Sequence, residues 1–350
     1  MEKKKIALIG CGGMGTGHLR GYLNIPDAEI VALCDIVPGR AESKRAMGFP
    51  DVPCYTDYKE VLAIPGLDAV DICTPNYLHS IIAVEALNCG LHVFCEKPDA
   101  VNVEEVLKMK AAAEANERIL MVMRNNRYNP ASRYLKQFIE EGKMGEIYAG
   151  RCGWQRRRGI PGKGGWFTTK EKSGGGPLID LGVHMIDLAI WLMGNPTPVA
   201  VSGCTYCKFA NSNITDSTES RFGDKNAEGV YNVEDLAMGF IRFDNGACLQ
   251  IEFSWASNVE EEKYFVELRG TKAGAYWPNL KIFTEEYGST VDIKPNIAAG
   301  RNHHEANLAH FVDVLNGKAE PEFVPQQGVN MIKILRAMYE SAEAGHEIAL

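Results

Sequence analysis

The sequence lacks a long hydrophobic run and an excess of positive charge. No apolar segment in its 350 residues approaches the roughly 20 residues that cross a bilayer. The basic residues Lys3–Lys5 are followed only by a strand-length apolar run, whereas a secretory signal needs a longer one. The formal net charge of -8 disfavours nucleic acid and anionic membrane surfaces, because both attract basic patches. We therefore expect a cytoplasmic protein that binds neither.

A cysteine framework of the disulfide or zinc type is also lacking. The ten cysteines are scattered, and several lie within apolar stretches, where reduced cysteine behaves as a small hydrophobe. Cys204 and Cys207 form a closely spaced pair, but a zinc site needs two more ligands and no second pair is present. We interpret the pair as residues in or near a strand of a protein from a reducing compartment. Internal repeats and low-complexity tracts are absent as well.

What is present in the first part of the chain is an alternation of strands and helices. Short apolar, β-branched runs are separated by segments of helical periodicity up to about residue 123. These runs cover residues 6–10, 30–34, 69–73, 92–95 and 120–122. Such alternation predicts a parallel sheet with crossover helices.

A glycine-rich turn marks the join between the first strand and the first helix. Its residues are Gly10, Gly12, Gly13, Met14 and Gly15. In this position Gly10 permits the tight turn, Gly12 lets the backbone approach a pyrophosphate, and Gly15 lets the helix pack closely on the strand. The phosphates would lie at the helix N-terminus. The turn therefore predicts a dinucleotide-binding Rossmann domain, here assigned to residues 1–125.

Asp35 ends the second strand, twenty positions after Gly15, where a carboxylate accepts hydrogen bonds from the adenosine ribose. The same charge repels the 2′-phosphate of NADP, so we predict NAD as the cofactor, with Ile36 beside it. Arg40 follows closely and could offset the repulsion, which leaves use of NADP open.

The remainder, residues 126–350, has the pattern of an α+β domain. Strand-like alternation dominates from 199 to 294, with a hairpin turn at Asp244–Gly246, and predicts a large, mainly antiparallel open sheet. Helical patterns cover residues 131–141, 178–192, 305–316 and 327–344. Residues 150–177 form a stretch rich in Gly, Arg and Trp, and residues 211–226 read as a polar surface loop. The C-terminal helix is expected to pack back on the first domain.

Two segments carry residues suited to proton transfer, which hydride transfer to a nicotinamide requires of the protein. One is Glu96-Lys97-Pro98. In the other, Asp180, His184 and Asp187 share one helix face by their spacing. A histidine on an apolar face can also be a hydrogen-bonded core residue. One histidine and two carboxylates could also bind zinc, although no further His or Cys lies nearby at ligand spacing. We predict no metal.

These motifs together resemble the Gfo/Idh/MocA family of oxidoreductases, which includes glucose-fructose oxidoreductase and inositol dehydrogenase. The resemblance rests on the glycine turn, Thr74-Pro75-Asn76 with His79, Glu96-Lys97-Pro98 and Asp180-x-x-x-His184, and it spans nearly the whole chain. It implies that Lys97, Asp180 and His184 are catalytic: Lys97 contacts the reacting hydroxyl, His184 exchanges the proton, and Asp180 orients the substrate. It also implies further cofactor contacts, namely Thr74, Pro75, Asn76, His79, Glu96, Lys97 and Trp166. Asp99 departs from the apolar residue expected there. A carboxylate so close to Lys97 favours its charged form, which leaves the identity of the formal base open.

The segment from Gly153 to Pro161 resembles family members that act on sugars and glycosides. Its arginines also fit a solvated turn, but Lys163, Trp166 and the glycine run follow, so it is a candidate pocket wall with hydroxyl donors and aromatic faces. The predicted substrate contacts are Lys97, Asn126, Tyr128, Trp154, Arg156, Arg158, Asp180 and His184.

The predicted reaction is NAD-dependent, reversible oxidation of a secondary ring hydroxyl of a sugar or glycoside, at carbon 3 by resemblance, to a keto-sugar. Inositol 2-dehydrogenation is the nearest alternative. A non-catalytic NAD-binding regulator is another, and retention of Lys97, Asp180 and His184 counts against it. A metal-dependent hydrolase on the same scaffold is a third. We expect a homo-oligomer formed through the open sheet, because few helices remain to cover its outer face.

Overall fold

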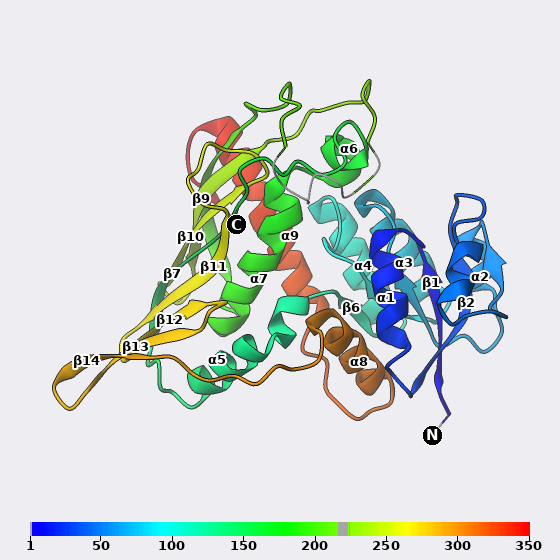
Figure 1. Cartoon of the computed structure of the whole chain (residues 1–350), viewed down its shortest axis with the longest axis horizontal. Coiled ribbons are helices and arrows are strands. Elements are labelled where there is room, and N and C mark those ends of the chain that lie inside the picture. Colours follow the sequence, from blue (N-terminus) through cyan, green and yellow to red (C-terminus); the bar gives the residue numbers. More distant parts are fainter. Residues whose placement is uncertain (1, 216–222, 224) are drawn as a thin grey trace. The chain divides into compact units, whose positions relative to one another are not determined.

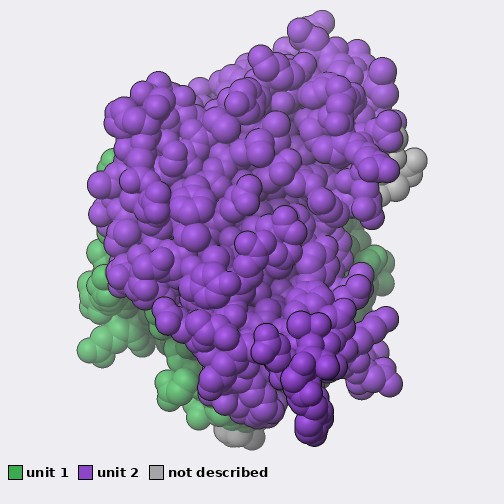
Figure 2. Space-filling model, turned by 90° about the vertical axis from the view of Figure 1, so that its left-hand side faces the viewer, with its two compact units in different colours: residues 1–123, 301–329 green, residues 124–300, 330–350 purple. Residues whose placement is uncertain are grey.

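The computed structural model describes residues 2–215, 223 and 225–350, and it divides the chain into two compact units (Figures 1 and 2). Unit 1 comprises residues 1–123 and 301–329, and unit 2 comprises 124–300 and 330–350. The division after Met123 lies two residues before the predicted boundary. Residues 301–329, which include the helix at 303–315 and the first residues of the C-terminal helix, belong to the first unit.

Unit 1 is built on a six-stranded sheet in the order β3-β2-β1-β4-β5-β6, in which every strand pair is parallel. This is the order of a doubly wound dinucleotide-binding fold, as predicted. Its elements are β1 (Lys4–Ile9), α1 (Gly13–Tyr22), β2 (Ala28–Cys34), η1 (Glu42–Met47), β3 (Cys54–Tyr55), α2 (Tyr58–Leu62), β4 (Ala69–Ile72), η2 (Asn76–Leu78), α3 (His79–Asn88), β5 (His92–Cys95), α4 (Val103–Ala115), β6 (Leu120–Val122) and α8 (His303–Leu315). Apart from Lys4 and Lys5 at the start of β1 and Asp71 in β4, the residues of these two strands are apolar and buried on both faces, as expected for a parallel sheet covered by helices.

Unit 2 contains a nine-stranded sheet in the order β14-β13-β12-β11-β7-β10-β9-β8-β15. All strand pairs are antiparallel except the parallel pair of β7 with β10, so the predicted mainly antiparallel sheet is confirmed. Its strands are β7 (Ile147–Gln155), β8 (Pro198–Tyr206), β9 (Leu236–Phe243), β10 (Cys248–Ser254), β11 (Lys263–Gly270), β12 (Ala273–Trp277), β13 (Lys281–Glu286), β14 (Ser289–Ile293) and β15 (Ile348–Ala349). The turn at Asp244–Gly246 joins β9 to β10 as predicted, with Gly246 at a φ of 84°.

Unit 2 contains the predicted helices over 131–141 and 327–344, which begin at Pro130 and Pro325, together with short helical turns that were not predicted. Its helical segments are η3 (Asn125–Tyr128), α5 (Pro130–Glu140), η4 (Trp166–Thr168), α6 (Lys170–Ser173), η5 (Leu178–Gly182), α7 (Val183–Leu192) and α9 (Pro325–Ala344), whose first turn belongs to unit 1. The start of α5 follows from its sequence, since Asn129 caps the backbone N–H of Ala131 and Pro130 occupies the first turn. The predicted single helix over 178–192 is instead a π-helical turn, η5, followed by α7.

The sheet of unit 2 has two different faces. Helices α7 and α9 pack on one of them, where Met338 of α9 lies against Gly203 and Gly239 (Figure 1). Figure 2 shows unit 2 from the opposite side. The face seen in Figure 2 is the one that we predicted to bind another subunit.

One helical stretch, Lys170–Leu192, is long and apolar enough by composition to cross a membrane, which corrects the expectation that no segment approaches that length. It is a core element, because 83% of its apolar window is buried. Of the loop predicted over 211–226, residues 216–222 and 224 lie outside the described residues, and the others form neither helix nor strand.

Candidate active site

The glycine turn has the geometry that its proposed role requires. Gly10 has a φ of 99°, and a Cβ there would lie 2.6 Å from the carbonyl of Cys73. A Cβ on Gly15 would overlap the carbonyl oxygen of Gly10, so α1 can approach β1 only with glycine at this position. A Cβ on Gly12 would meet nothing within 4 Å. The turn is therefore closed toward the sheet at Gly10 and Gly15 and open at Gly12.

Helix α1 begins with Gly13 and Met14. No side chain caps its N-terminus, and its first turn contains no acidic residue. Its first backbone N–H groups and the positive end of the helix dipole thus suit a phosphate group.

Asp35 is fixed beside this turn and is 7% exposed. One carboxylate oxygen accepts the backbone N–H of Cys11 at 2.8 Å, and the other accepts that of Val37 at 2.9 Å. Arg40 lies 3.7 Å from the second oxygen, which brings the residue that could offset repulsion of a 2′-phosphate next to Asp35. Each carboxylate oxygen retains a further lone pair for a ribose hydroxyl. Ile36 is 83% exposed, as a residue in contact with a bound nucleotide would be before binding.

His79 joins the two other predicted cofactor segments. Its ring nitrogens lie 2.9 Å from the carbonyl oxygen of Thr74 and 2.7 Å from that of Pro98, and the side chain has no exposed surface. Burial lowers the pKa of His79, against the effect of these two carbonyls. In the structure His79 joins the backbone of Thr74 to that of Pro98, which supports the segment Thr74-Pro75-Asn76.

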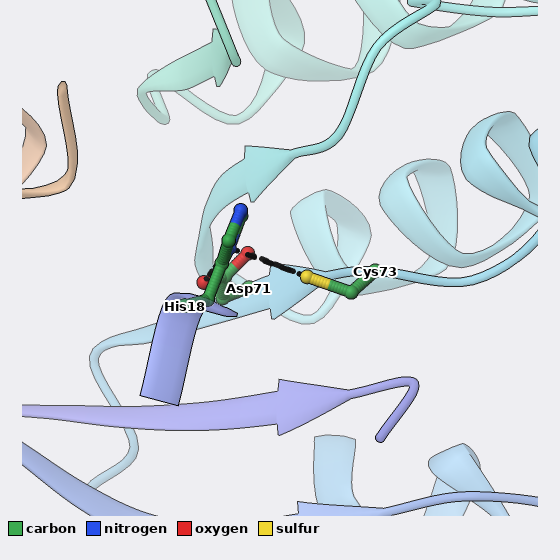
Figure 3. Close-up of side chains that lie close together, drawn as sticks. All are labelled: His18, Asp71 and Cys73. Atoms are coloured by element: carbon green, nitrogen blue, oxygen red, sulfur yellow. Dashed lines mark hydrogen bonds and ion pairs between the residues drawn. The ribbon is translucent and has the colours of Figure 1, made fainter. Parts of the chain in front are cut away.

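A buried ionic cluster underlies the same part of unit 1. Nδ1 of His18 lies 2.8 Å from Asp71 and 3.2 Å from the sulfur of Cys73 (Figure 3). Nε2 of His18 lies 2.9 Å from Glu96. Burial disfavours the imidazolium, but Asp71 and Cys73 outweigh it and raise the pKa of His18 well above its ordinary value. Burial likewise opposes ionisation of Glu96, yet the bond and charge of His18 lower the pKa of Glu96 to about 2.

His18, Asp71 and Cys73 also have ligand atoms within 4.8 Å of one another, as a metal site would. A metal needs a neutral imidazole nitrogen, however, and here both nitrogens point at carboxylates and act as donors. We interpret the cluster as a salt-bridged support. Glu96 also accepts the backbone N–H of Lys97 at 3.0 Å, which connects the cluster to the predicted catalytic lysine.

Sequence reasoning missed this cluster. The available signal was Asp71, a carboxylate inside an otherwise apolar strand that must find a partner. It also missed His304 on α8, whose pKa is lowered to about 4 by burial and which interacts electrostatically with Glu96 and Lys97. Asp99, which we expected to influence Lys97, is 2% exposed and places a carboxylate oxygen where a Cβ on Gly328 of α9 would stand.

In unit 2, the π-helical turn η5 carries Asp180 and α7 carries His184. The indole N–H of Trp255 donates to the Asp180 carboxylate at 3.0 Å, and the rings of His184 and Trp154 lie 6.1 Å apart. Asp180 and His184 thus share a setting of aromatic side chains.

Asp187 does not belong to this group, contrary to the shared face predicted from the spacing. It is 5% exposed and binds Arg127 through both carboxylate oxygens, with Arg124 donating at 2.9 Å. The physical reason is the π-helical turn, whose wider hydrogen-bonding register changes the rotation between Asp180 and Asp187. The pairing of Asp187 with two arginines also disfavours the zinc alternative, which needed both carboxylates as ligands.

Glu234 holds the start of η5. Its buried carboxylate accepts the backbone N–H of Gly176 at 2.9 Å, that of Leu178 at 3.1 Å and the hydroxyl of Tyr339 at 2.9 Å. Burial raises the pKa of Glu234 in spite of these donors. A Cβ on Gly175 would overlap the Tyr339 hydroxyl, and one on Gly176 the Glu234 backbone oxygen. The glycine run before Asp180 is therefore required by packing, and sequence reasoning missed both partners.

The predicted pocket wall divides into two parts. Arg156 is buried and lies 5.1 Å over the ring of Trp154, whose neighbour is His184. Arg158 instead donates to Ser257 and Asn258 and lies 4.2 Å over Phe209, so it joins loops.

The other predicted contacts of unit 2 are also held by neighbours. Lys163 binds the carbonyl of Ser212, and Trp166 stacks on Phe167 with centroids 3.8 Å apart. Asn126 and Tyr128 lie on η3 and are each 9% exposed.

The sequence matches the oxidoreductase family with an NAD-binding Rossmann fold over residues 4–124 and the C-terminal alpha/beta domain of the same family over residues 136–350. The chain belongs to the Gfo/Idh/MocA family. The resemblance stated from the motifs is thereby confirmed, and residues 4–124 form an NAD-binding domain of an oxidoreductase.

Relatives of this oxidoreductase act on sugars and cyclitols by name. D-glucoside 3-dehydrogenase of Escherichia coli (strain K12) is 32% identical over 348 residues, which cover 99% of this chain and 97% of that protein. The scyllo-inositol 2-dehydrogenase (NAD(+)) of Bacillus subtilis (strain 168) is 30% identical, with 90% and 87% covered. A solved structure of levoglucosan dehydrogenase in complex with NADH and levoglucosan has a TM-score of 0.84 at 25% identity and covers 99% of both chains.

Proposed function

We propose that this oxidoreductase uses NAD to oxidise a secondary ring hydroxyl of a sugar or glycoside, at carbon 3, to a keto-sugar, and that the reaction is reversible. The proposal is carried by two placements in unit 2: the carboxylate of Asp180 is held by the indole of Trp255, and the imidazole of His184 lies beside the ring of Trp154. The likeness to D-glucoside 3-dehydrogenase over almost the whole chain supports it.

The residues divide the chemistry between them. When bound, NAD would supply the acceptor for the hydride of the carbinol carbon, so the protein must remove the hydroxyl proton. His184 takes this proton and passes it to solvent, while Lys97 donates a hydrogen bond to the reacting oxygen. Asp180, held by Trp255, accepts a hydrogen bond from a neighbouring hydroxyl and orients the ring. In the reverse direction the same groups return the proton.

We propose NAD rather than NADP because the Asp35 carboxylate would repel a 2′-phosphate. A cytoplasmic location is proposed from the ten free cysteines, and a homo-oligomer from the face of the unit 2 sheet opposite α7 and α9. Light scattering after size-exclusion chromatography tests the oligomer, and a monomer would contradict it.

The second candidate is oxidation of a cyclitol, which the likeness to scyllo-inositol 2-dehydrogenase (NAD(+)) favours. A cyclitol presents the same ring hydroxyls to the same residues, but it lacks an anomeric carbon and an aglycone. Glycosides, free sugars and inositols therefore separate the two candidates.

The test is NADH formation across a panel of glycosides, free sugars and inositols, with NADP in parallel. We expect turnover of glycosides, and identification of a 3-keto product by NMR. His184→Ala should lower turnover by roughly 10²–10⁴ while NAD affinity, measured by fluorescence, stays unchanged. Turnover only of inositols would favour the second candidate, and near wild-type turnover of His184→Ala would contradict the role of His184.

A further inference from the structure

A row of aromatic rings extends from His184 across the sheet of unit 2. After the 6.1 Å step from His184 to Trp154, the ring of Tyr264 lies 5.3 Å from that of Trp154 and 5.8 Å from that of Trp277. Trp154 of β7 and Tyr264 of β11 are directly paired in the antiparallel ladder, so their side chains stand on the same face. The row therefore continues from the proposed proton-transfer residue to a neighbouring strand.

Tyr264, the third ring of this row, is open to solvent. Tyr264 is 45% exposed, whereas Trp277 beneath it is 2% exposed and contacts it edge-on. A large aromatic ring that is exposed on one side and packed on the other offers an apolar surface whose ordering cost is already met by the fold. Trp154 is held in a similar way by the buried guanidinium of Arg156.

The geometry points to a second subsite, in which Tyr264 with Trp154 binds the group attached to the reacting sugar of a glycoside. This inference rests on the proposed function, since it takes the reacting ring to lie at His184. The ligand chemistry is a ring with a flat apolar face, which both an aryl aglycone and a second pyranose present. A methyl aglycone is too small to cover Tyr264. Tyr264 is thus a specificity-determining residue for glycosides over free sugars.

The experiment compares methyl glucoside, phenyl glucoside and a glucose disaccharide as substrates of the full chain at saturating NAD. We expect Tyr264→Ala to lower kcat/KM for the phenyl glucoside and the disaccharide roughly three- to tenfold, through KM, and to leave methyl glucoside unchanged. Tyr264→Phe should restore wild-type values, because the ring and not the hydroxyl forms the surface. The two larger substrates distinguish an aryl group from a second sugar as the preferred occupant.

Tyr148→Ala is the matched control. Tyr148 is 49% exposed and lies on β7 like Trp154, but at the opposite end of that strand. This control should leave all three substrates unaffected. Equal effects of Tyr264→Ala on all three substrates, or no effect on any, would overturn the subsite.

The proposed function and the subsite can fail separately. If the wild-type protein oxidises no glycoside, the proposed function fails, and the subsite is then judged from calorimetric binding of phenyl and methyl glucoside to the protein with NADH. Weaker binding of phenyl glucoside alone in Tyr264→Ala would support the subsite. Equal affinity in wild type and Tyr264→Ala, including no measurable affinity in either, would overturn it.

Discussion

The indole N–H of Trp255 donates a hydrogen bond of 3.0 Å to the carboxylate of Asp180. Trp255 follows β10 and has no exposed surface, whereas Asp180 lies on the π-helical turn before α7. The bond therefore ties the sheet to the turn that carries a proposed catalytic carboxylate. Because Trp255 is fixed on every side by packing, its donor holds Asp180 in one orientation.

Trp255→Phe removes this donor and keeps most of the ring. Loss of a hydrogen bond to a charged group corresponds to roughly 1.5–3 kcal/mol, so we expect kcat to fall about 10-fold to 100-fold. NAD affinity should not change, because the residue belongs to unit 2. Steady-state kinetics with the best glycoside provide the measurement. Trp191→Phe is the control, since Trp191 is 5% exposed in the same unit and should lose stability without a comparable loss of kcat.

Glu234→Ala should destabilise the protein more than Tyr339→Phe. Tyr339→Phe removes one donor to the Glu234 carboxylate and should lower the free energy of unfolding by about 1.5–3 kcal/mol. Glu234→Ala leaves that hydroxyl and the N–H groups of Gly176 and Leu178 without their acceptor, so its effect should exceed ~3 kcal/mol. Denaturant unfolding measures both. Equal losses would show that the two backbone bonds contribute nothing.

The sequence predicted those features of the fold and site that local pattern determines. The glycine turn, Asp35 after the second strand and the hairpin at Asp244–Gly246 each follow from short-range spacing and backbone requirements. The strand β7 was not predicted, although it is central in the sheet of unit 2. Its residues include Gly150, Arg151 and Gly153, whose strand conformation depends on pairing with β10 and β11.

The supports of the site were beyond sequence reasoning because they join residues far apart in the chain. His18 meets Glu96 across 78 positions, and Tyr339 meets Glu234 across 105. The helical spacing of Asp180 and Asp187 was misleading for another reason. A π-helical turn lies between them. We attribute its formation to Glu234 and the packed glycines rather than to local helix propensity.

Gly12→Ala should weaken NAD binding with little effect on stability, whereas Gly15→Ala should lower stability. A Cβ on Gly12 meets open space, so the free energy of unfolding should stay within about 0.5 kcal/mol while NAD affinity falls roughly tenfold. A Cβ on Gly15 overlaps the Gly10 carbonyl, which should lower stability by about 1–3 kcal/mol. Gly17→Ala is the control on exposed α1 surface, and it should raise stability slightly without changing affinity. Unchanged NAD affinity of Gly12→Ala would contradict the proposed phosphate approach.

Asp35→Asn should weaken the preference for NAD. The amide carries no charge to repel a 2′-phosphate, and Arg40 at 3.7 Å is then free of its ion pair and can bind that phosphate. We expect the ratio of kcat/KM for NADP over NAD to rise roughly tenfold or more. Adding Arg40→Ala should remove most of that gain. A ratio unaffected by Asp35→Asn would mean that this carboxylate only holds the N–H groups of Cys11 and Val37.

His18→Gln should destabilise the protein in a pH-dependent way. The folded pKa of His18 is raised above its ordinary 6.5, so its contribution is complete below pH 6.5 and declines as pH rises toward the folded value. The pKa of Glu96 is lowered from 4.5 to about 2, so its contribution is complete above pH 4.5. Between pH 4.5 and 6.5, loss of the buried His18 imidazolium should therefore lower the free energy of unfolding by about 3–5 kcal/mol.

Above pH 6.5 the difference in the free energy of unfolding between wild type and His18→Gln should shrink, by at most about 1.4 kcal/mol per pH unit. Denaturant unfolding at pH 5.5, 7 and 8.5 measures it. His346→Gln is the control, because His346 is exposed, and its free energy of unfolding should stay close to that of wild type at each pH. A difference in the free energy of unfolding that stays constant from pH 5.5 to 8.5 would require that the pKa of His18 is the same in the folded protein and in the unfolded chain. That result would contradict a stabilised imidazolium between Asp71 and Glu96.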